Sequence, residues 1–281
     1  MNITRPVAEP SRAGDRTPPE RILLASNGGP ASAAALRWVI DRVGHRDAEV
    51  QVVDVVDPTA MDAGQRRTSV QGMVRLLEVV APSVHPTVMI AADDPRELFS
   101  RSHGAILVVG VHRRDRRPTH FAERAVAGAH GAVVVVPSEW ISREGPVVVG
   151  VGAEDDVSAT LAFAESEAST AGAELHLVHV WDTTGPGEIP PAWDFGTESI
   201  PERQERALAR LARAQRGAHP GVAMTSEAVQ GQAVAQLTQA ARAASLLVVG
   251  RSHRNAVMRA VFGSTADGLI AELPCPVAVI P

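Results

Sequence analysis

The sequence predicts an α/β protein built from two tandem doubly wound parallel-sheet domains. Short apolar runs alternate with amphipathic runs along the chain, as in a series of βαβ units. Several apolar runs are unbroken and stop at glycine, as in 246–250, which is typical of strands buried on both faces. The order of these runs also begins again about halfway along the 281 residues.

The first half is expected to contain an arm and one complete unit. Residues 1–20 are rich in proline among Arg, Ser and Asp, which predicts a disordered arm before a domain at 21–137. Runs rich in Val, Ile and Leu predict five strands, at 21–26, 49–56, 84–91, 105–110 and 132–136. Apolar residues at helical spacing between them predict helices, at 31–43, 65–80, 95–102 and 121–129.

The second half repeats this pattern after a linker at 138–145 and is expected to form a domain at 146–281. Its strands are predicted at 146–151, 173–180, 222–229, 246–250 and 277–280. Its helices are predicted at 157–171, 198–217 and 232–243, with a short amphipathic run after Thr265. The segment 104–110 echoes 244–250, and 131–137 echoes 275–281, so we interpret the chain as a tandem duplication.

Composition excludes several classes of function. A net charge of -5 with pI ≈ 6.1 argues against a nucleic-acid partner, and 3% aromatic residues argue against base stacking. The one cysteine, Cys275 between two prolines, predicts a packing residue and fits a reducing compartment, so we expect a cytoplasmic protein. No apolar run reaches the ~18 residues of a membrane span.

No catalytic or metal-binding pattern emerges, and we do not expect an enzyme. The chain lacks a Gly-x-x-x-x-Gly-Lys-Ser/Thr phosphate loop and a Gly-x-Ser-x-Gly nucleophile elbow. A dinucleotide fingerprint beginning at Gly150 and Gly152 would need a third glycine that is absent. His176 and His179 would face opposite sides of a strand and cannot share a metal ion.

The segment from Gly250 to Thr265 carries the strongest functional signal. An apolar strand ends at Gly250, and Arg251 and His253 follow; Gly263, Ser264 and Thr265 then open a helix. Backbone N–H groups and hydroxyls at a helix N-terminus can hold an anion. The same residues also suit an N-capped helix with solvated arginines.

A strand ending in Gly-x-x-Gly, nine residues, Gly-Ser and a final Pro-Cys-Pro-Val strand resembles the universal stress protein family. The resemblance implies a Rossmann-like fold with strand order 3-2-1-4-5 in each half, and a site between the first and fourth strands. It also implies that Gly250, Gly263, Ser264 and Thr265 hold the phosphates of ATP, which Mg²⁺ would accompany. Arg251 would add positive charge beside them, and the His253 ring could donate to a phosphate. Gly152 and Val180 would line the nucleoside end.

Two departures from the family pattern predict reduced affinity. His253 replaces a glycine, and its Cβ restricts a positive φ angle there. Gly152 stands where the family has an aspartate that takes part in binding the nucleoside. In the first half the corresponding loop is four residues shorter and Asn27 is at the aspartate position, so we expect no nucleotide there.

Family members pair their last strands between copies. The run from Val133 to Val136 is therefore expected to pair with that from Val277 to Ile280 inside the chain, as a pseudo-dimer, with a homodimer of chains left open. Two functions remain: an adenine-nucleotide-binding regulatory module with a protein partner, or a nucleotide-independent interaction protein. The long connection at 181–199 either approaches the adenine or covers a helix face.

Overall fold

The computed structural model describes residues 18–55, 63–91, 98, 102–112, 116–152, 157–182, 199–251 and 265–281. Most of the helix predicted at 95–102 and of the 181–199 connection lies outside these ranges. For 116–120 only the backbone is described.

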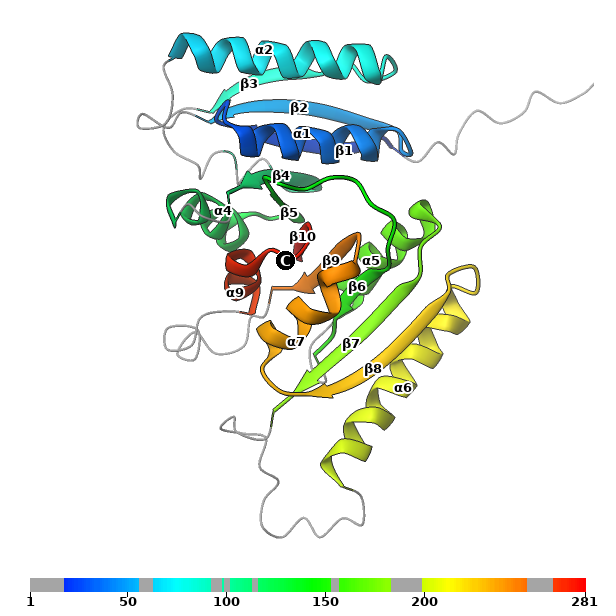
Figure 1. Ribbon diagram of the computed structural model, residues 1–281. Coiled ribbons are helices and arrows are strands. Elements are labelled where there is room, and N and C mark those ends of the chain that lie inside the picture. The colour runs from blue at the N-terminus through cyan, green and yellow to red at the C-terminus, as the bar shows by residue number, and fades with distance from the viewer. Residues whose placement is uncertain are drawn as a thin grey trace, which may run out of the picture.

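Ten strands form one sheet in the order β3-β2-β1-β4-β5-β10-β9-β6-β7-β8 (Figure 1). The first half contributes β1 (Glu20–Ser26), β2 (Ala48–Val55), β3 (Thr87–Ala91), β4 (Ala105–Val111) and β5 (Val133–Pro137). The second contributes β6 (Val147–Gly150), β7 (Leu175–Trp181), β8 (Met224–Gln230), β9 (Leu246–Gly250) and β10 (Val277–Ile280). Each half therefore has the strand order 3-2-1-4-5, which confirms the predicted doubly wound fold.

The two halves meet where β5 and β10 pair antiparallel. Val277 is opposite Val135, Ala278 opposite Val134 and Val279 opposite Val133, whereas every other described strand pair is parallel. All six side chains are buried. This confirms the predicted pairing inside the chain, which covers two valine-rich edges that would otherwise be open to other strands.

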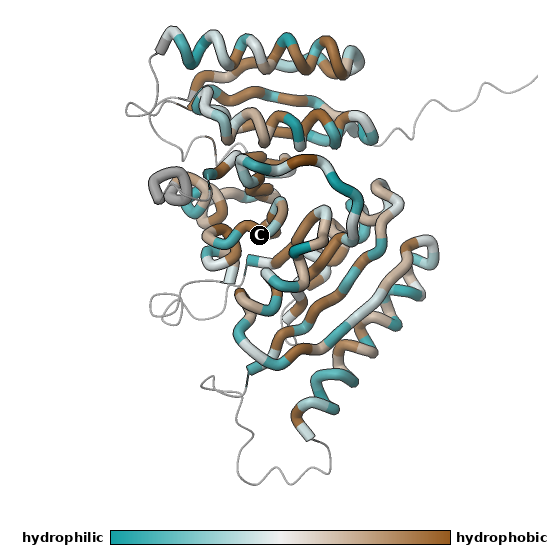
Figure 2. The backbone as a smooth tube through the Cα atoms, viewed as in Figure 1, coloured by the Kyte–Doolittle hydropathy of each residue, from teal (hydrophilic) through white to brown (hydrophobic). Residues whose placement is uncertain are grey.

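Helices cover both faces of the sheet. One face carries α1 (Pro30–Val43), α2 (Ala63–Val80), α5 (Ser158–Ala171) and α6 (Ile200–Ala218). The other carries α4 (Arg116–Gly128), α7 (Ala233–Ala240) with the short 3₁₀ turn Ala241–Ala243, and α9 (Thr265–Glu272). Figure 2 shows the hydrophobic strands between these layers, as expected for parallel strands buried on both sides.

Most element boundaries differ from the predictions by one or two residues, and three differ by more. The strand expected from 84 begins at Thr87, because Pro86 has no N–H to donate to a ladder. The helix expected from 121 begins at Arg116, because Pro118 lies in its first turn, where helices accept proline. The helix expected to reach 243 tightens into a 3₁₀ turn after Ala240.

Arg42 at the end of α1 links the two halves on the α1/α5 face. Its guanidinium donates to Glu20 of β1 (Nε–Oε2 2.5 Å) and to Glu167 of α5 (Nη1–Oε2 2.5 Å). Its Cζ atom lies 5.1 Å from the Trp38 ring centroid and 5.9 Å from that of Phe163. Burial alone would lower the pKa of Arg42, but the hydrogen bonds and charges of the two glutamates outweigh it and raise the pKa.

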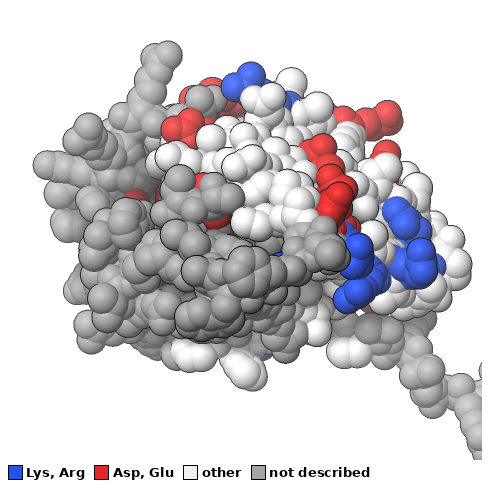
Figure 3. Space-filling model, turned by 90° about the horizontal axis from the view of Figure 1, so that it is seen from below, with Lys and Arg blue, Asp and Glu red and all other residues white. Residues whose placement is uncertain are grey.

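The surface carries charges of both signs. Figure 3 shows basic and acidic side chains in neighbouring groups on one face, in line with 27 Lys+Arg against 32 Asp+Glu in the sequence. Among the described helices, none is long and apolar enough to span a membrane.

Candidate functional site

The carboxyl ends of β6 and β9 form the point where strand order reverses in the second half. The two strands are parallel neighbours, with Gly150 opposite Val249. The chain leaves β6 toward α5 on one face of the sheet, whereas α9, the helix after β9, packs on the other face. In open α/β sheets, ligands bind beyond the strand ends at such a point, so we take this edge as the candidate site.

The strand register brings three of the predicted residues to this edge. Gly150 is opposite Val249 of β9 and Val178 of β7, so Gly152, Val180 and Gly250 all lie just beyond these partners. Gly152 and Gly250 are exposed. Val180 is half-buried and packs against the core on the α7 side of the sheet.

Of the other predicted residues, some are described by the structure and some are not. Thr265 is the first residue of α9 and is exposed. His253, Gly263 and Ser264 lie outside the described residues.

The Arg251 side chain reaches the first half of the molecule. Its Nη1 donates to the carbonyl oxygens of Val126 (2.8 Å), Ala127 (3.3 Å) and Ala129 (3.0 Å), at the C-terminal end of α4. These carbonyls carry the negative end of the helix dipole, which a guanidinium stabilises. The side chain that we expected at a phosphate is thus engaged with a helix end across the two halves.

A buried histidine holds the backbone next to Gly152. His179 on β7 places Nδ1 2.8 Å from the Val151 carbonyl oxygen, so this ring nitrogen donates to it, and Nε2 lies 3.0 Å from Oε1 of Gln204 on α6. The contact orients the peptide that joins Val151 to Gly152. His179 was not among the predicted site residues, and its one signal in the sequence is a histidine immediately before Val180.

His179 and His176 do lie on opposite faces of β7, as predicted. The His176 ring contacts Thr225 Oγ1 at 2.8 Å and Glu227 Oε1 at 3.3 Å on the neighbouring strand, whereas the His179 ring contacts Gln204 of α6. No group of three or more His, Cys, Asp or Glu side chains within the described part of the chain is arranged to hold a metal ion.

Gly250 also has a packing role. A Cβ at this position would lie 3.0 Å from Oγ1 of Thr160, a buried residue in the first turn of α5. The glycine therefore lets α5 approach the end of β9. This accounts for Gly250 in structural terms, independently of any ligand.

In the first half the corresponding edge is occupied by its own side chains. Oδ1 of Asn27 accepts hydrogen bonds from the Gly29 N–H (3.0 Å) and the Ser32 hydroxyl (3.0 Å). Asp54 at the end of β2 accepts from Arg66 of α2 (2.7 Å), and both side chains are nearly buried. The polar groups at this edge thus satisfy one another.

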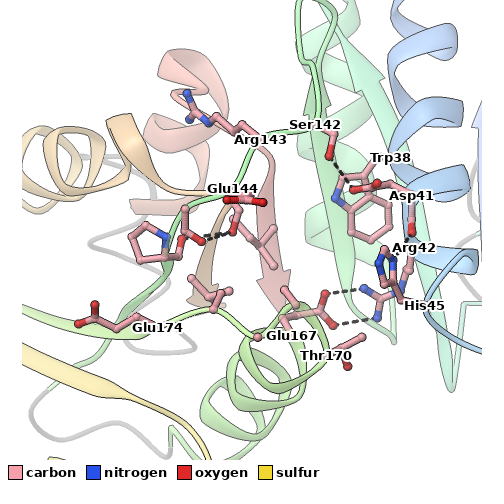
Figure 4. A pocket seen from close by; sticks show the side chains of 18 of the residues that line it. Trp38, Asp41, Arg42, His45, Ser142, Arg143, Glu144, Glu167, Thr170 and Glu174 are labelled. Carbon is pink, nitrogen blue, oxygen red and sulfur yellow. Dashed lines mark hydrogen bonds and ion pairs between the residues drawn. The ribbon is translucent and has the colours of Figure 1, made fainter.

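A cavity of about 810 Å³ lies at the other end of the strands. Its walls are the C-terminal ends of α1 and α5, the 138–145 segment and the beginnings of β6 and β9 (Figure 4). The Arg42–Glu167 pair crosses it, and Ser142 donates to Asp41 (2.9 Å). Because ligands of doubly wound sheets bind beyond the carboxyl ends of the strands, we do not assign this cavity to the candidate site.

Cys275 is a packing residue, as predicted. It is 1% exposed, and burial raises the pKa of its thiol to about 12, opposed in part by Arg143. The thiol is therefore neutral near pH 7 and a poor nucleophile.

The sequence is similar to that of universal stress proteins. The universal stress protein family model matches residues 145–281. A universal stress protein of Mycobacterium tuberculosis strain H37Rv is 24% identical over 92% of this chain and 94% of its own length. A second one from that strain is 29% identical over 48% of this chain and 47% of its own.

A solved structure shows the same fold over nearly the whole chain. The crystal structure of a universal stress protein from Archaeoglobus fulgidus covers 92% of this chain and 95% of its own, with a TM-score of 0.63 at 16% identity. Both halves of the ten-stranded arrangement thus have a counterpart in a solved structure.

Proposed function

The chain belongs to the universal stress protein family, and on that premise we propose that its second half is a regulatory module that binds an adenine nucleotide. The nucleotide is ATP, which enters with Mg²⁺ bound to its phosphates. The bound state changes the affinity of the molecule for a protein partner in the cytoplasm, a compartment that suits its single buried cysteine.

One observation carries this proposal. Gly152, Val180 and Gly250 lie together at the switch point of the second half, and the segment that carries Gly263, Ser264 and Thr265 begins at Gly250 and ends at the N-terminus of α9. Val180 offers an apolar surface for a base, and the exposed glycines leave the backbone accessible. The equivalent edge of the first half is filled by Asn27 and its partners.

We expect an affinity below that of nucleotide-binding relatives. Gly152 provides no carboxylate for the ribose, and the Arg251 guanidinium is held by α4 carbonyls. Both losses remove charge-assisted hydrogen bonds, which are the strongest polar contacts available to a nucleotide.

Isothermal titration with ATP, with and without magnesium, tests the proposal. Gly263→Leu should abolish binding, whereas Gly72→Leu, on α2 with no atom within 4 Å of its new Cβ, should leave it unchanged. Gly152→Asp should strengthen binding about tenfold, the value of one charge-assisted hydrogen bond of ~1.4 kcal/mol. The proposal is wrong if millimolar ATP gives no heat and does not raise the melting temperature.

A nucleotide-independent interaction protein is the second candidate. The Arg251 contacts favour it, because the α4 carbonyls already hold the one described cation next to Gly250. In that case Gly152→Asp would leave the chain unable to bind ATP. We propose no catalytic activity in either case, and phosphate release from ATP equal in the wild type and Gly263→Leu would support this.

A further inference from the structure

We propose that two copies of this chain associate through the outer edge of the first half, where β3 of one copy pairs antiparallel with β3 of the other. The contact would be isologous, with a two-fold axis between the copies. It does not depend on nucleotide binding.

β3 is an end strand of the sheet with an apolar exposed surface. It pairs with β2 from Thr87 to Ala91, and no described strand lies on its other side (Figure 1). Val88 is 50% exposed and Ile90 64% exposed, and the strand contains no charged residue. Edge strands of this kind accept another strand, since nothing in them opposes pairing.

The outer edge of the second half is different. β8 carries Thr225 and Glu227, and the Glu227 side chain is 51% exposed and contacts His176. A charged side chain on an edge strand discourages pairing with other chains. The two halves share a fold, so the apolar edge is a property of the first half alone.

Val88 and Ile90 lie on the α2 side of the sheet. Val88 is in register with Val52, which belongs to the core beneath α1 and α2, and side chains in register on neighbouring strands point to the same face. Ile90 is two residues on and shares this face. A second copy would therefore bring its own α2 toward these two side chains.

The flank of α2 above β3 carries a polar stripe. Val70, Met73 and Leu77 point into the core, and Ser69 donates to the Gly28 carbonyl (3.1 Å) at the end of β1. The Ser69 flank therefore faces β1. Helical geometry places the opposite flank over β3, with the stripe Arg67, Gln71, Val74 and Glu78.

This stripe is complementary to itself when reversed. Two antiparallel copies of α2 centred between Gln71 and Val74 would place Arg67 of each copy opposite Glu78 of the other. An ion pair between helices beside two antiparallel strands already occurs inside the chain, where Arg42 of α1 contacts Glu167 of α5, although there both residues lie near the C-terminal ends of their helices.

Sedimentation velocity at protein concentrations between about 1 and 100 µM tests the proposal. A dimer of micromolar affinity would dissociate at the low end of this range. Wild type should dimerise. Ile90→Lys should weaken the dimer at least tenfold, because it places two like charges at the edge. Ile141→Lys is the matched control: Ile141 is 69% exposed but lies in the 138–145 segment, and its replacement should change nothing.

A charge exchange between two variants distinguishes the loss of this contact from misfolding of the variants as the cause of weaker self-association. Arg67→Glu and Glu78→Arg should each weaken self-association, because each makes both contacts repulsive. Mixed one to one, the two variants should form a heterodimer in which both contacts are attractive. A wild-type chain that stays monomeric at about 100 µM overturns the proposal, and so does a dimer that tolerates Ile90→Lys and both single exchanges.

Discussion

Glu165 of α5 is a buried carboxyl group. Its Oε2 lies 2.9 Å from Nε2 of His219 at the end of α6, and its Oε1 has no hydrogen-bond partner in the described part of the chain. The residue is 4% exposed. Burial raises the pKa of Glu165, and the charge of His219 opposes this only in part.

Burial makes the ionised form of the Glu165 carboxyl unfavourable in the folded state, and this raises its pKa there. Between its ordinary value of 4.5 and the raised value the folded state binds more protons than the unfolded state, so this group's contribution to stability falls as pH rises through that window. Glu165→Gln should remove this fall and raise the free energy of unfolding at pH 7. Urea unfolding of both proteins from pH 4 to 8 measures it; parallel pH profiles would contradict the prediction.

At the scale of elements, α1 packs closely on the end of β4. A Cβ on Gly110 would lie 1.9 Å from the carbonyl oxygen of Ala31 in the first turn of α1. The obstacle is backbone, which cannot rotate away. Among the described residues, the equivalent Cβ in the second half, on Gly250, meets the side-chain oxygen of Thr160 at 3.0 Å rather than backbone.

The internal repeat thus supplies a matched pair of substitutions. Gly110→Ala should lower the free energy of unfolding by about 3 kcal/mol or more, because helix and strand must separate. Gly250→Ala should cost less than about 1 kcal/mol, because the Thr160 hydroxyl can rotate. Chemical denaturation compares them, and equal costs would show that the two helices pack alike.

At the scale of the whole molecule, the halves are joined by backbone and by charge. The β5–β10 pair makes the sheet continuous, and Arg42 connects β1 and α1 of the first half with α5 of the second. The Arg42 side chain is 5% exposed and that of Glu167 12% exposed. Arg46 also contacts Glu167 (3.2 Å) and partly shares its charge.

Arg42→Ala should therefore destabilise the protein by about 3 kcal/mol, because it leaves a nearly buried carboxylate with a weaker partner. Arg21→Ala is the control, since that side chain makes one long hydrogen bond (3.4 Å) at an exposed position. Equilibrium unfolding followed by tryptophan fluorescence measures both. A loss for Arg42→Ala no larger than for the control would exclude a role in joining the halves.

Much of the fold was predictable because burial on both faces leaves a strong pattern. Unbroken valine runs predicted the strands, and their repetition predicted two units and the β5–β10 contact. Boundaries were less accurate at Pro86 and Pro118, where the position of proline in the turn or helix decides its effect. Of the predicted site residues, the strand pattern located Gly152, Val180 and Gly250 at one sheet edge, and their role in binding stays a prediction.

The sequence by itself determined the α/β class, the duplication and the pairing of the two valine-rich edges, because these depend on hydrophobic periodicity along the chain. Only the tertiary structure decided that Arg251 contacts α4, that His179 holds the peptide before Gly152 and that Arg42 links the halves. These are contacts between residues far apart in the sequence, and which polar group meets which is set by how helices and strands pack.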